Sequence, residues 1–290
     1  MGRRTTRSLV ISERPHERRF PRGVPQPGPA RFRKHTLPMN PGDLPVVGPI
    51  SNVEKNYLPQ LAHLTTLTSS RVLCVGFSAE EIDELIAPHR PAEVISLTNW
   101  VDHVDAATTR YPLVMGDLCG RTDFPASHFD HVITLSVLEH LHDLDGACRE
   151  VKRILRRNGW FLSFFGPAWS CAYGHHLYAN PEDPNLNFTS WQLPAHMHLL
   201  CDTQEISDWY LQRGYSSETA KSVQHWFFET KLINRLPYDA YLSAFQRHFQ
   251  IAWMEGMYNT IPTAHLDRLR AKLGPGDYST YGGKFALVNT

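Results

Sequence analysis

The sequence has no long apolar run and no excess of charge of either sign. No stretch approaches the roughly 20 apolar residues that a membrane-spanning helix needs. Lys and Arg together number 29, as do Asp and Glu, so the formal net charge is zero. A chain without net positive charge has no strong overall field to attract nucleic acid. The sequence therefore argues against a membrane protein and against a nucleic-acid partner, and no oligomeric state is inferred from it.

Cysteines are few, and their number is odd. The chain contains 5 of them, with no paired spacing, at Cys74, Cys119, Cys148, Cys171 and Cys201. An odd number without paired spacing is typical of a chain whose thiols stay reduced. We therefore expect free thiols and a cytoplasmic location.

Large apolar residues are scarce after position 11 in the Arg- and Pro-rich first 45 residues. Such a segment buries too little apolar surface to offset its ordering entropy. We interpret residues 1–45 as a flexible tail that is dispensable for folding, and residues 46–290 as one domain. The alternative is a basic arm for nucleic acid or an organelle address, although Glu13 and Glu17 count against a transit peptide.

Residues 71–165 alternate short apolar runs with segments of helical periodicity. Continuous apolar runs are typical of parallel strands that are buried on both faces. The strand–helix–strand order favours an α/β fold with a doubly wound sheet. The expected strands cover 71–75, 93–97, 111–115, 130–135 and 160–165, and the expected helices cover 79–87 and 143–156.

The alternation ends after residue 165. Residues 166–200 are rich in Pro, Gly, His, Asn and aromatic residues, and they are too many for a plain connection. We expect this second half to cover the sheet rather than to form a separate domain. Its expected elements are a helix over 203–213, a strand over 222–231, helical structure over 238–272 and a last strand over 284–290.

The turn after the first expected strand contains a single glycine. The segment "VGFSAE", residues 75–80, has Gly76 where a dinucleotide-binding turn has three glycines. The pyrophosphate of a nicotinamide cofactor needs the close backbone approach that those glycines allow. The sequence therefore argues against a nicotinamide cofactor at this turn.

A stretch of the sequence matches the motifs of a known family. Residues 116–165, which begin "GDLCGRTDFP" and contain "SVLEHL", resemble the class I methyltransferases that use S-adenosylmethionine. The wider resemblance covers roughly residues 71–215. It implies a seven-stranded, mostly parallel sheet of order 3-2-1-4-5-7-6, with an antiparallel last strand and helical lid insertions. The matching residues are Gly116-Asp117, Phe129-Asp130, Val137-Leu138-Glu139-His140, Glu150, Arg153, Leu155 and Asn158-Gly159.

The resemblance also implies S-adenosylmethionine as the cofactor and names the residues around it. Residues 71–165 would be the cofactor-binding half, and residues 166–290 the substrate and lid half. The family has an acid and two further glycines where this chain has Cys74, Ser78 and Glu80. Its acid for the ribose hydroxyls is replaced by Thr98 or Asn99. The implied cofactor-binding residues are Gly76, Phe77, Ser78, Glu80, Thr98, Asn99, Asp117, Leu118, Leu135, Glu139 and His140.

Candidate catalytic residues follow the fifth expected strand, at the edge where ligands of such sheets bind. His175 and His176 are adjacent, and a neutral imidazole suits removal of a proton from a hydroxyl or amine. Some class I methyltransferases have a similar Gly-His-His after this strand. The alternative is a pair of structural histidines bonded to backbone. Aromatic side chains of the same loop suit a planar or sugar substrate, and these are Trp169, Tyr173, Tyr178 and Trp191.

The same loop is dense in potential zinc ligands. Thiolate and imidazole groups both suit zinc. Their spacings, Cys-x3-His-His and His-x-His-x2-Cys, match no zinc module, so we expect no metal. The residues are Cys171, His175, His176, His196, His198 and Cys201.

Three functions remain open from the sequence. The first is S-adenosylmethionine-dependent methyl transfer to an O or N nucleophile of a small molecule, in a biosynthetic role. The second is a catalytically silent methyltransferase-like subunit or binding protein, which the eroded turn favours. The third is a nucleic-acid methyltransferase recruited by the basic tail, although the chain lacks the Asn/Asp-Pro-Pro-aromatic motif of many base methylators.

Overall fold

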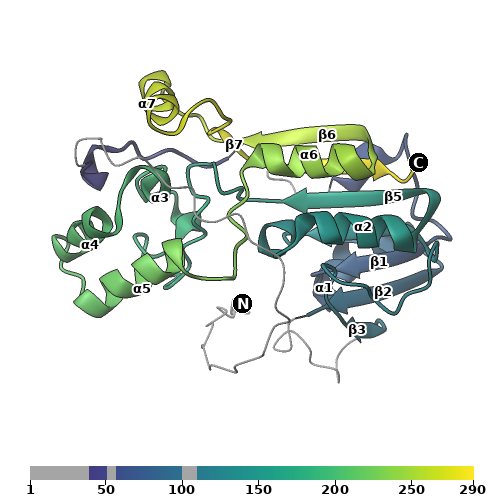
Figure 1. Cartoon of the computed structure of the whole chain (residues 1–290). Helices are drawn as coiled ribbons and strands as arrows, with labels where there is room; N and C mark the ends of the chain where they lie inside the picture. Colours follow the sequence, from purple (N-terminus) through teal and green to yellow (C-terminus); the bar gives the residue numbers. More distant parts are fainter. Residues whose placement is uncertain (1–38, 51–56, 100–109) are drawn as a thin grey trace, which may run out of the picture. The chain divides into compact units, whose positions relative to one another are not determined.

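The computed structural model describes residues 39–50, 57–99 and 110–290, and seven strands of this part form one sheet (Figure 1). Their order is β3-β2-β1-β4-β5-β7-β6, with parallel pairs from β3 to β5 and β7 antiparallel between β5 and β6. The predicted fold class is confirmed. The strands are β1 (Arg71–Val75), β2 (Glu93–Thr98), β3 (Leu113–Met115), β4 (Phe129–Leu135), β5 (Leu155–Phe165), β6 (Gln250–Tyr258) and β7 (Thr280–Val288).

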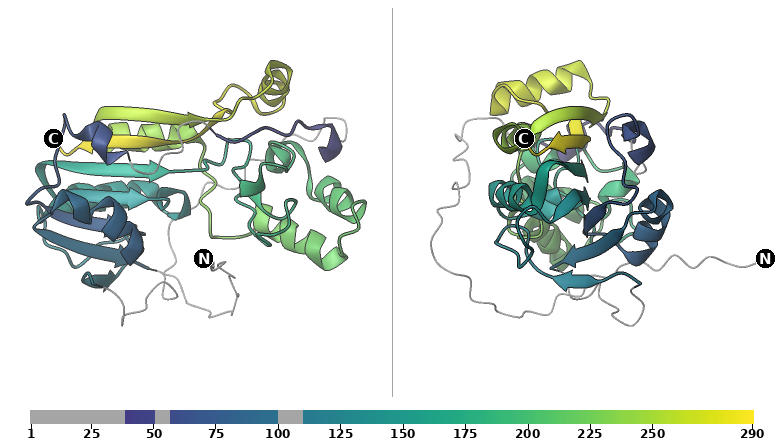
Figure 2. Two further views of the ribbon diagram at one scale, coloured as in Figure 1. Left: turned by 180° about the vertical axis from the view of Figure 1, so that it is seen from behind. Right: turned by 90° about the vertical axis from the view of Figure 1, so that its right-hand side faces the viewer.

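Helices cover both faces of the sheet. The long helices α2 and α6 pack on one face, and α1 and η2 pack on the other (Figures 1 and 2). Within the described residues, no helix is both long and apolar enough to cross a membrane. The helices are η1 (Pro41–Asp43), η2 (Leu58–Leu61), α1 (Ala79–Leu85), η3 (Ala87–His89), η5 (Leu138–His140), α2 (Leu144–Ile154), η6 (Phe188–Ser190), α3 (Met197–Leu200), α4 (Thr203–Leu211), α5 (Ser217–Phe228), α6 (Tyr238–His248) and α7 (Thr263–Leu273).

Helix α2 explains part of the family motif. Asp143 caps its N-terminus, where Oδ1 accepts a hydrogen bond of 2.8 Å from the Gly146 N–H. Further along, the Glu150 carboxylate accepts from the Thr122 N–H at 2.8 Å and from the Arg153 guanidinium at 2.6 and 2.8 Å. The guanidinium also donates to the Phe124 carbonyl at 2.8 Å. These two motif residues therefore fasten α2 to the segment before β4.

The second half of the chain has a core of its own. Helices α3, α4 and α5 lie beyond the end of the sheet toward which β5 points (Figure 1). Their apolar faces pack together around fully buried side chains rather than against the strands. We call this part the lid. Its buried centre includes Met197, Leu200, Ile206, Tyr210, Val223 and Phe227.

The expected strand over 222–231 is wrong, because these residues belong mostly to α5. Ser216 caps this helix, and its hydroxyl accepts a hydrogen bond of 3.1 Å from the Thr219 N–H. Ala220, Val223 and Phe227 are spaced three and four residues apart and are all buried. That spacing is helical, and the β-branched and aromatic residues had suggested a strand.

The expected helix over 238–272 is also wrong in its middle, where β6 runs along the edge of the sheet. In β6, exposed and partly buried residues alternate from Gln250 to Glu255, which is the period of a strand with one covered face. Glu255 pairs with Lys284 of β7, whose Nζ lies 2.9 Å from a carboxylate oxygen. Two smaller differences concern β5, which begins at Leu155, and β3, which begins at Leu113.

The segment 39–45 packs against the lid, so the expectation of a tail with few packed contacts is wrong there. Leu44 is 5% exposed and belongs to the lid core. The Pro45 carbonyl accepts a hydrogen bond of 2.8 Å from the Ala195 N–H. The Met39 N–H donates to the Glu205 carboxylate of α4. Residues 1–38 of the predicted tail lie outside the described residues.

We predict that Leu44→Ala lowers the free energy of unfolding by roughly 2–5 kcal/mol, the usual cost of truncating a buried leucine. Val46→Ala is the matched control, because Val46 is 59% exposed, and such a change usually shifts stability by no more than about 0.5 kcal/mol. Urea unfolding of the two variants and the wild type measures the difference. Equal midpoints would show that this segment contributes nothing to the folded state.

The lid buries several histidines in hydrogen bonds that fix their tautomers. His196 donates from Nε2 to the Tyr278 carbonyl at 2.7 Å, so its Nδ1 accepts from His265 at 3.1 Å. His198 donates from Nε2 to the Trp169 carbonyl at 2.8 Å. Burial lowers the pKa of His196 to about 3 and that of His198 to about 4. Both rings are therefore neutral in the folded protein near neutral pH.

We predict that the fold loses stability as the pH falls below about 6.5, the pKa of a histidine in the unfolded chain. Below that pH the unfolded chain binds protons that buried His196 and His198 do not, so protonation favours unfolding. Each ring would cost about 2 kcal/mol at pH 5. Urea unfolding at pH 7.5 and pH 5 tests this, with exposed His225→Gln as a control that keeps the same loss. Equal stability at both pH values would contradict it.

Candidate active site

The ends of three neighbouring strands bring predicted cofactor residues to one edge of the sheet. Gly76 follows β1, Asn99 follows β2 and Asp117 comes two residues after β3. The strands pair in parallel up to these positions, with Val75 opposite Leu97 and Thr98 opposite Met115. The carboxyl edge of such a sheet is the usual place for a ligand.

Glycine is the only residue type that fits at position 76, in the turn after β1. Its φ is +77°, which favours glycine, and its N–H donates a hydrogen bond of 3.2 Å to the Leu97 carbonyl. A Cβ at this position would lie 2.2 Å from Cγ2 of Val137. The backbone of β1 and the residue that opens the "VLEH" motif are therefore in direct contact.

The residues at the two other glycine positions of the family turn, Ser78 and Glu80, stabilise the N-terminus of α1. Ser78 and Glu81 form a capping box in which each side chain accepts the other's backbone N–H at 3.1 Å. Glu80 is exposed in the first turn of α1, where an acid is favourable. Cys74 is fully buried within β1, and burial raises the pKa of its thiol, so it packs as an apolar residue.

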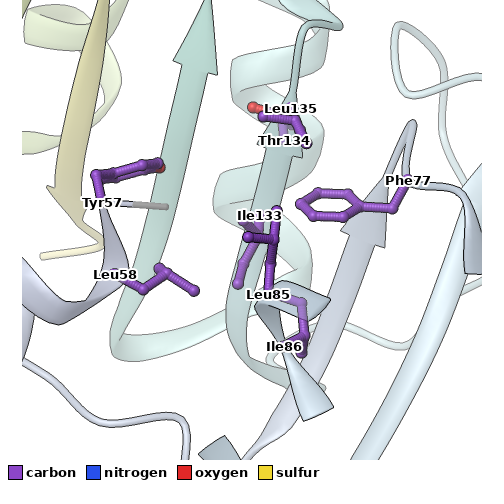
Figure 3. Close-up of a pocket in the computed structure, with 8 residues that line it drawn as sticks. All are labelled: Tyr57, Leu58, Phe77, Leu85, Ile86, Ile133, Thr134 and Leu135. Carbon is purple, nitrogen blue, oxygen red and sulfur yellow. The ribbon is translucent and has the colours of Figure 1, made fainter. Parts of the chain in front are cut away.

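Three other predicted cofactor residues turn their side chains into the core. Figure 3 shows the Phe77 ring pointing toward Ile133, in a small apolar pocket that Leu135 also lines. Leu118 is 3% exposed and packs on the face that α2 covers. At these positions the backbone, rather than the side chain, is left for a ligand at the edge of the sheet.

Polar groups of Asn99 and Asp117 remain open at the edge. Asn99 is exposed. Asp117 has a side chain that is 44% exposed; its Oδ1 accepts the Cys119 N–H at 2.8 Å, and its Oδ2 lies 3.9 Å from Nδ1 of His142. An amide and a carboxylate at this edge suit a ligand that carries hydroxyl and amino groups.

Glu139 lies on the short helix η5, which directly follows the turn after β4. Its carboxylate is 2% exposed and accepts a hydrogen bond of 3.2 Å from the N–H of Gly166, the residue after β5. The Asn234 N–H donates to the Glu139 carbonyl at 2.9 Å, and the Asn234 side chain donates to the Leu138 carbonyl at 2.7 Å. The segment after α5 therefore holds η5 in place.

The imidazole ring of His140, the last residue of η5, lies close to that of His176. Their ring centroids are 5.6 Å apart. Nδ1 of His140 donates to the Leu232 carbonyl at 2.6 Å, and Nδ1 of His176 donates to the Gly174 carbonyl at 2.8 Å. Each ring is therefore left with its lone pair on Nε2. Burial lowers the pKa of His176 to about 3, so its ring is neutral near neutral pH.

The two adjacent histidines point to different places. His175 is fully buried and stacks on Phe227 of the lid at 4.4 Å, and its Nδ1 accepts the Leu177 N–H at 3.0 Å. Burial lowers its pKa well below the usual value. His176 is the one that the structure brings to Glu139 and His140. A sequence cannot show which of two neighbouring side chains faces a site.

Of the four aromatic residues predicted to contact the substrate, two are in the lid core and two are partly exposed. Tyr173 is fully buried, and its hydroxyl donates to the Val47 carbonyl at 2.8 Å. Trp191 packs on Tyr173 at 5.4 Å, so both belong to the lid core. Trp169 and Tyr178 are partly exposed. Phe188, which packs on His176 at 5.6 Å, was missed because it lies 12 residues further along the chain.

A comparison with protein families identifies the part of the chain that contains this edge of the sheet. Residues 73–163, from β1 through β5, match the family model described as a methyltransferase domain. These residues form a methyltransferase domain. Its cofactor is S-adenosylmethionine, as the sequence predicted, and the sheet order is that of the class I fold.

Solved structures resemble the chain only weakly. An S-adenosylmethionine-dependent methyltransferase from Mesorhizobium loti is 17% identical, with a TM-score of 0.47, over 80% of this chain and 97% of that one. Geranyl diphosphate C-methyltransferase from Streptomyces coelicolor A3(2) is 12% identical, with a TM-score of 0.45, over 79% of this chain and 76% of that one. No curated protein matches the sequence.

The residues at the edge fit the cofactor of a methyltransferase domain in outline. Gly76 allows the close turn, while Asn99 and Asp117 offer polar atoms for hydroxyl and amino groups. The fit differs from the family at β2, where a neutral amide stands in place of a carboxylate and forms weaker hydrogen bonds. Residues 100–109, which follow Asn99 in the sequence, lie outside the described residues.

We predict that Gly76→Ala destabilises the methyltransferase domain, since the new Cβ would strike Val137 and alanine is strained at positive φ by roughly 1–2 kcal/mol. Adding Val137→Ala should restore the steric part of the loss and leave the backbone strain. Thermal unfolding of both variants, with Val137→Ala alone as control, separates the two effects. If Gly76→Ala melts with the wild type, the contact between this turn and Val137 does not constrain the fold.

Proposed function

We propose that this protein transfers a methyl group from S-adenosylmethionine to an O or N nucleophile of a small molecule, in a biosynthetic role. The observation that supports this most is the meeting of Glu139, His140 and His176 next to the end of β4. Glu139 and His140 belong to the family motif, and His176 belongs to the loop between β5 and α3, which we call the lid loop. The cluster therefore brings the cofactor-binding half and the substrate half of the chain together. The neighbouring strand ends hold the residues that fit the cofactor.

The lid supports a small substrate. Helices α3 to α5 lie beyond the carboxyl ends of the strands and have a buried apolar core of their own (Figure 1). A cover of this kind encloses a ligand and excludes water. The net charge is zero, so the chain has no strong overall field to attract a nucleic-acid acceptor.

The chain's own contribution to the chemistry would be to orient the acceptor. Bound S-adenosylmethionine would supply an electrophilic methyl group. We propose that Nε2 of His176 faces the hydroxyl or amine of the acceptor, since Nδ1 is occupied by the Gly174 carbonyl. A buried imidazole whose pKa is lowered to about 3 is a weak proton acceptor, so orientation outweighs proton removal here.

A second function has one specific observation in its favour. The capping box of Ser78 and Glu81 occupies backbone N–H groups that an open glycine-rich turn would leave for a ligand. A catalytically silent, methyltransferase-like binding protein would need no such groups. Calorimetry with S-adenosylmethionine and the purified full chain separates the two functions. Heat of binding at micromolar to millimolar cofactor supports the transferase, and its absence supports the silent protein.

We predict that His176→Gln lowers kcat about a hundredfold, the usual effect of a misplaced acceptor, and leaves the affinity for S-adenosylmethionine unchanged. Because the pKa of His176 is about 3, its protonation would produce no fall in rate near pH 6.5. Turnover with the acceptor, measured from pH 5.5 to 8.5, checks both points. His225→Gln is the control, since this residue is exposed on α5. Wild-type turnover of His176→Gln would remove His176 from the mechanism.

A further inference from the structure

Glu139, His140 and His176 have the composition of a metal site. One donor atom from each of the three lies within 4.8 Å of the other two. Nitrogen and oxygen ligands bind zinc at about 2.0–2.2 Å, so donors to one ion lie no more than about 4.4 Å apart. Small movements of the three side chains would therefore suffice to close the site around an ion.

The hydrogen bonds of the two histidines are those of metal ligands. Metal-binding histidines usually donate their other ring N–H to a carbonyl or carboxylate, which fixes the tautomer and the orientation of the ring. Both rings here donate from Nδ1 to a backbone carbonyl, that of Leu232 for His140 and that of Gly174 for His176. The lone pair of Nε2 is left for a ligand in both cases.

The position of His176 costs folding free energy, and no hydrogen bond to its Nε2 among the described residues offsets that cost. It is 7% exposed, and in the described part of the chain its Nε2 has no hydrogen-bond partner. A buried acceptor without a partner is destabilising. Its φ is +51°, an uncommon value for a residue other than glycine. The backbone is kept there because the Trp226 indole N–H donates to the His176 carbonyl at 2.8 Å.

We propose that Glu139, His140 and His176 bind a divalent transition-metal ion. Two imidazoles and one carboxylate suit Zn²⁺, Mn²⁺ or Fe²⁺ better than Mg²⁺ or Ca²⁺, which prefer oxygen ligands. Three protein ligands leave a coordination position open, as in catalytic zinc sites. The ion satisfies Nε2 of His176 and neutralises the buried carboxylate of Glu139.

The role of this ion rests on the proposed function. With an ion bound, the Nε2 lone pair of His176 would be used to hold the ion, and the ion rather than the imidazole would contact the acceptor hydroxyl. A metal ion that binds a hydroxyl lowers its pKa and orients it. Metal binding itself can be measured without any substrate.

A second group of potential ligands among the described residues serves as the internal comparison. Asp117, Cys119 and His142 also have donor atoms within 4.8 Å of one another. His142 and Asp117 have exposed side chains, and Oδ1 of Asp117 already accepts the Cys119 N–H. This group lacks the buried lone pair that His176 offers.

Titration of the chelator-treated full chain with Zn²⁺ and with Co²⁺ tests the proposal. We expect one high-affinity site by calorimetry, a visible Co²⁺ spectrum without a thiolate band, and a rise in melting temperature with Zn²⁺. Glu139→Gln, His140→Gln and His176→Gln should each weaken Zn²⁺ binding by at least tenfold, because even partners that only orient a ligand are worth that much. His142→Gln is the matched control and should bind like the wild type.

The outcomes distinguish this inference from the proposed function. Loss of Zn²⁺ binding in His142→Gln but not in His176→Gln would place the ion at the other group and overturn the inference. The inference would also be overturned if the wild-type chain bound Zn²⁺ no more tightly than exposed histidines do. If the chain binds S-adenosylmethionine but no metal ion, the metal site is overturned and the proposed function stands. If it binds a metal ion but no S-adenosylmethionine, the metal site stands and the proposed function is overturned. The Gln variants must melt as cooperative folds, and Glu139→Gln keeps an oxygen for the Gly166 N–H.

Discussion

The site depends on the hydrogen bonds that join η5 to the segment that directly follows the lid. Asn234 donates from its backbone and its side chain to consecutive carbonyls of η5, and its side-chain oxygen accepts from the Tyr241 hydroxyl at 2.9 Å. His140 reaches the same segment through the Leu232 carbonyl. Without this tie, the motif at the end of β4 and the histidines of the lid loop would belong to two separate cores. A buried polar network of this kind fixes one arrangement because each broken bond would leave a buried group unsatisfied.

The sequence predicted the sheet well, and the reasons are local. Continuous apolar runs marked β1, β2 and β4, and the family motif placed the remaining order, including the antiparallel β7. Much of that motif is structural. Asp130 accepts the Arg71 N–H at 2.7 Å at the start of β1, and Glu150 with Arg153 fastens α2. Residues with such local roles leave a readable pattern, which is why the methyltransferase domain was recognised from about fifty residues.

The second half of the chain was predicted poorly because its determinants are distant in sequence. The helix α5 and the strand β6 both contain aromatic and β-branched residues, and their periodicity was decided by which face another element covers. Ile206 and Val223 share a core with Leu44, a contact that no local window reveals. In the cluster of Glu139, His140 and His176, the last residue follows His140 by 36 positions in the chain. Its members were predicted singly, as cofactor and catalytic residues, and their meeting was not.

The turn after β1 and the surroundings of η5 differ in how far their polar groups are satisfied within the protein. At the turn after β1, Ser78 and Glu81 satisfy backbone groups that a ligand would otherwise satisfy, so this end of the site contributes less binding energy. Beside η5, Nε2 of buried His176 has a lone pair without a hydrogen-bond partner among the described residues. Such groups cost stability in the free protein and return it only when a ligand or ion satisfies them. This difference supports the proposal that the acceptor binds beside η5 and His176.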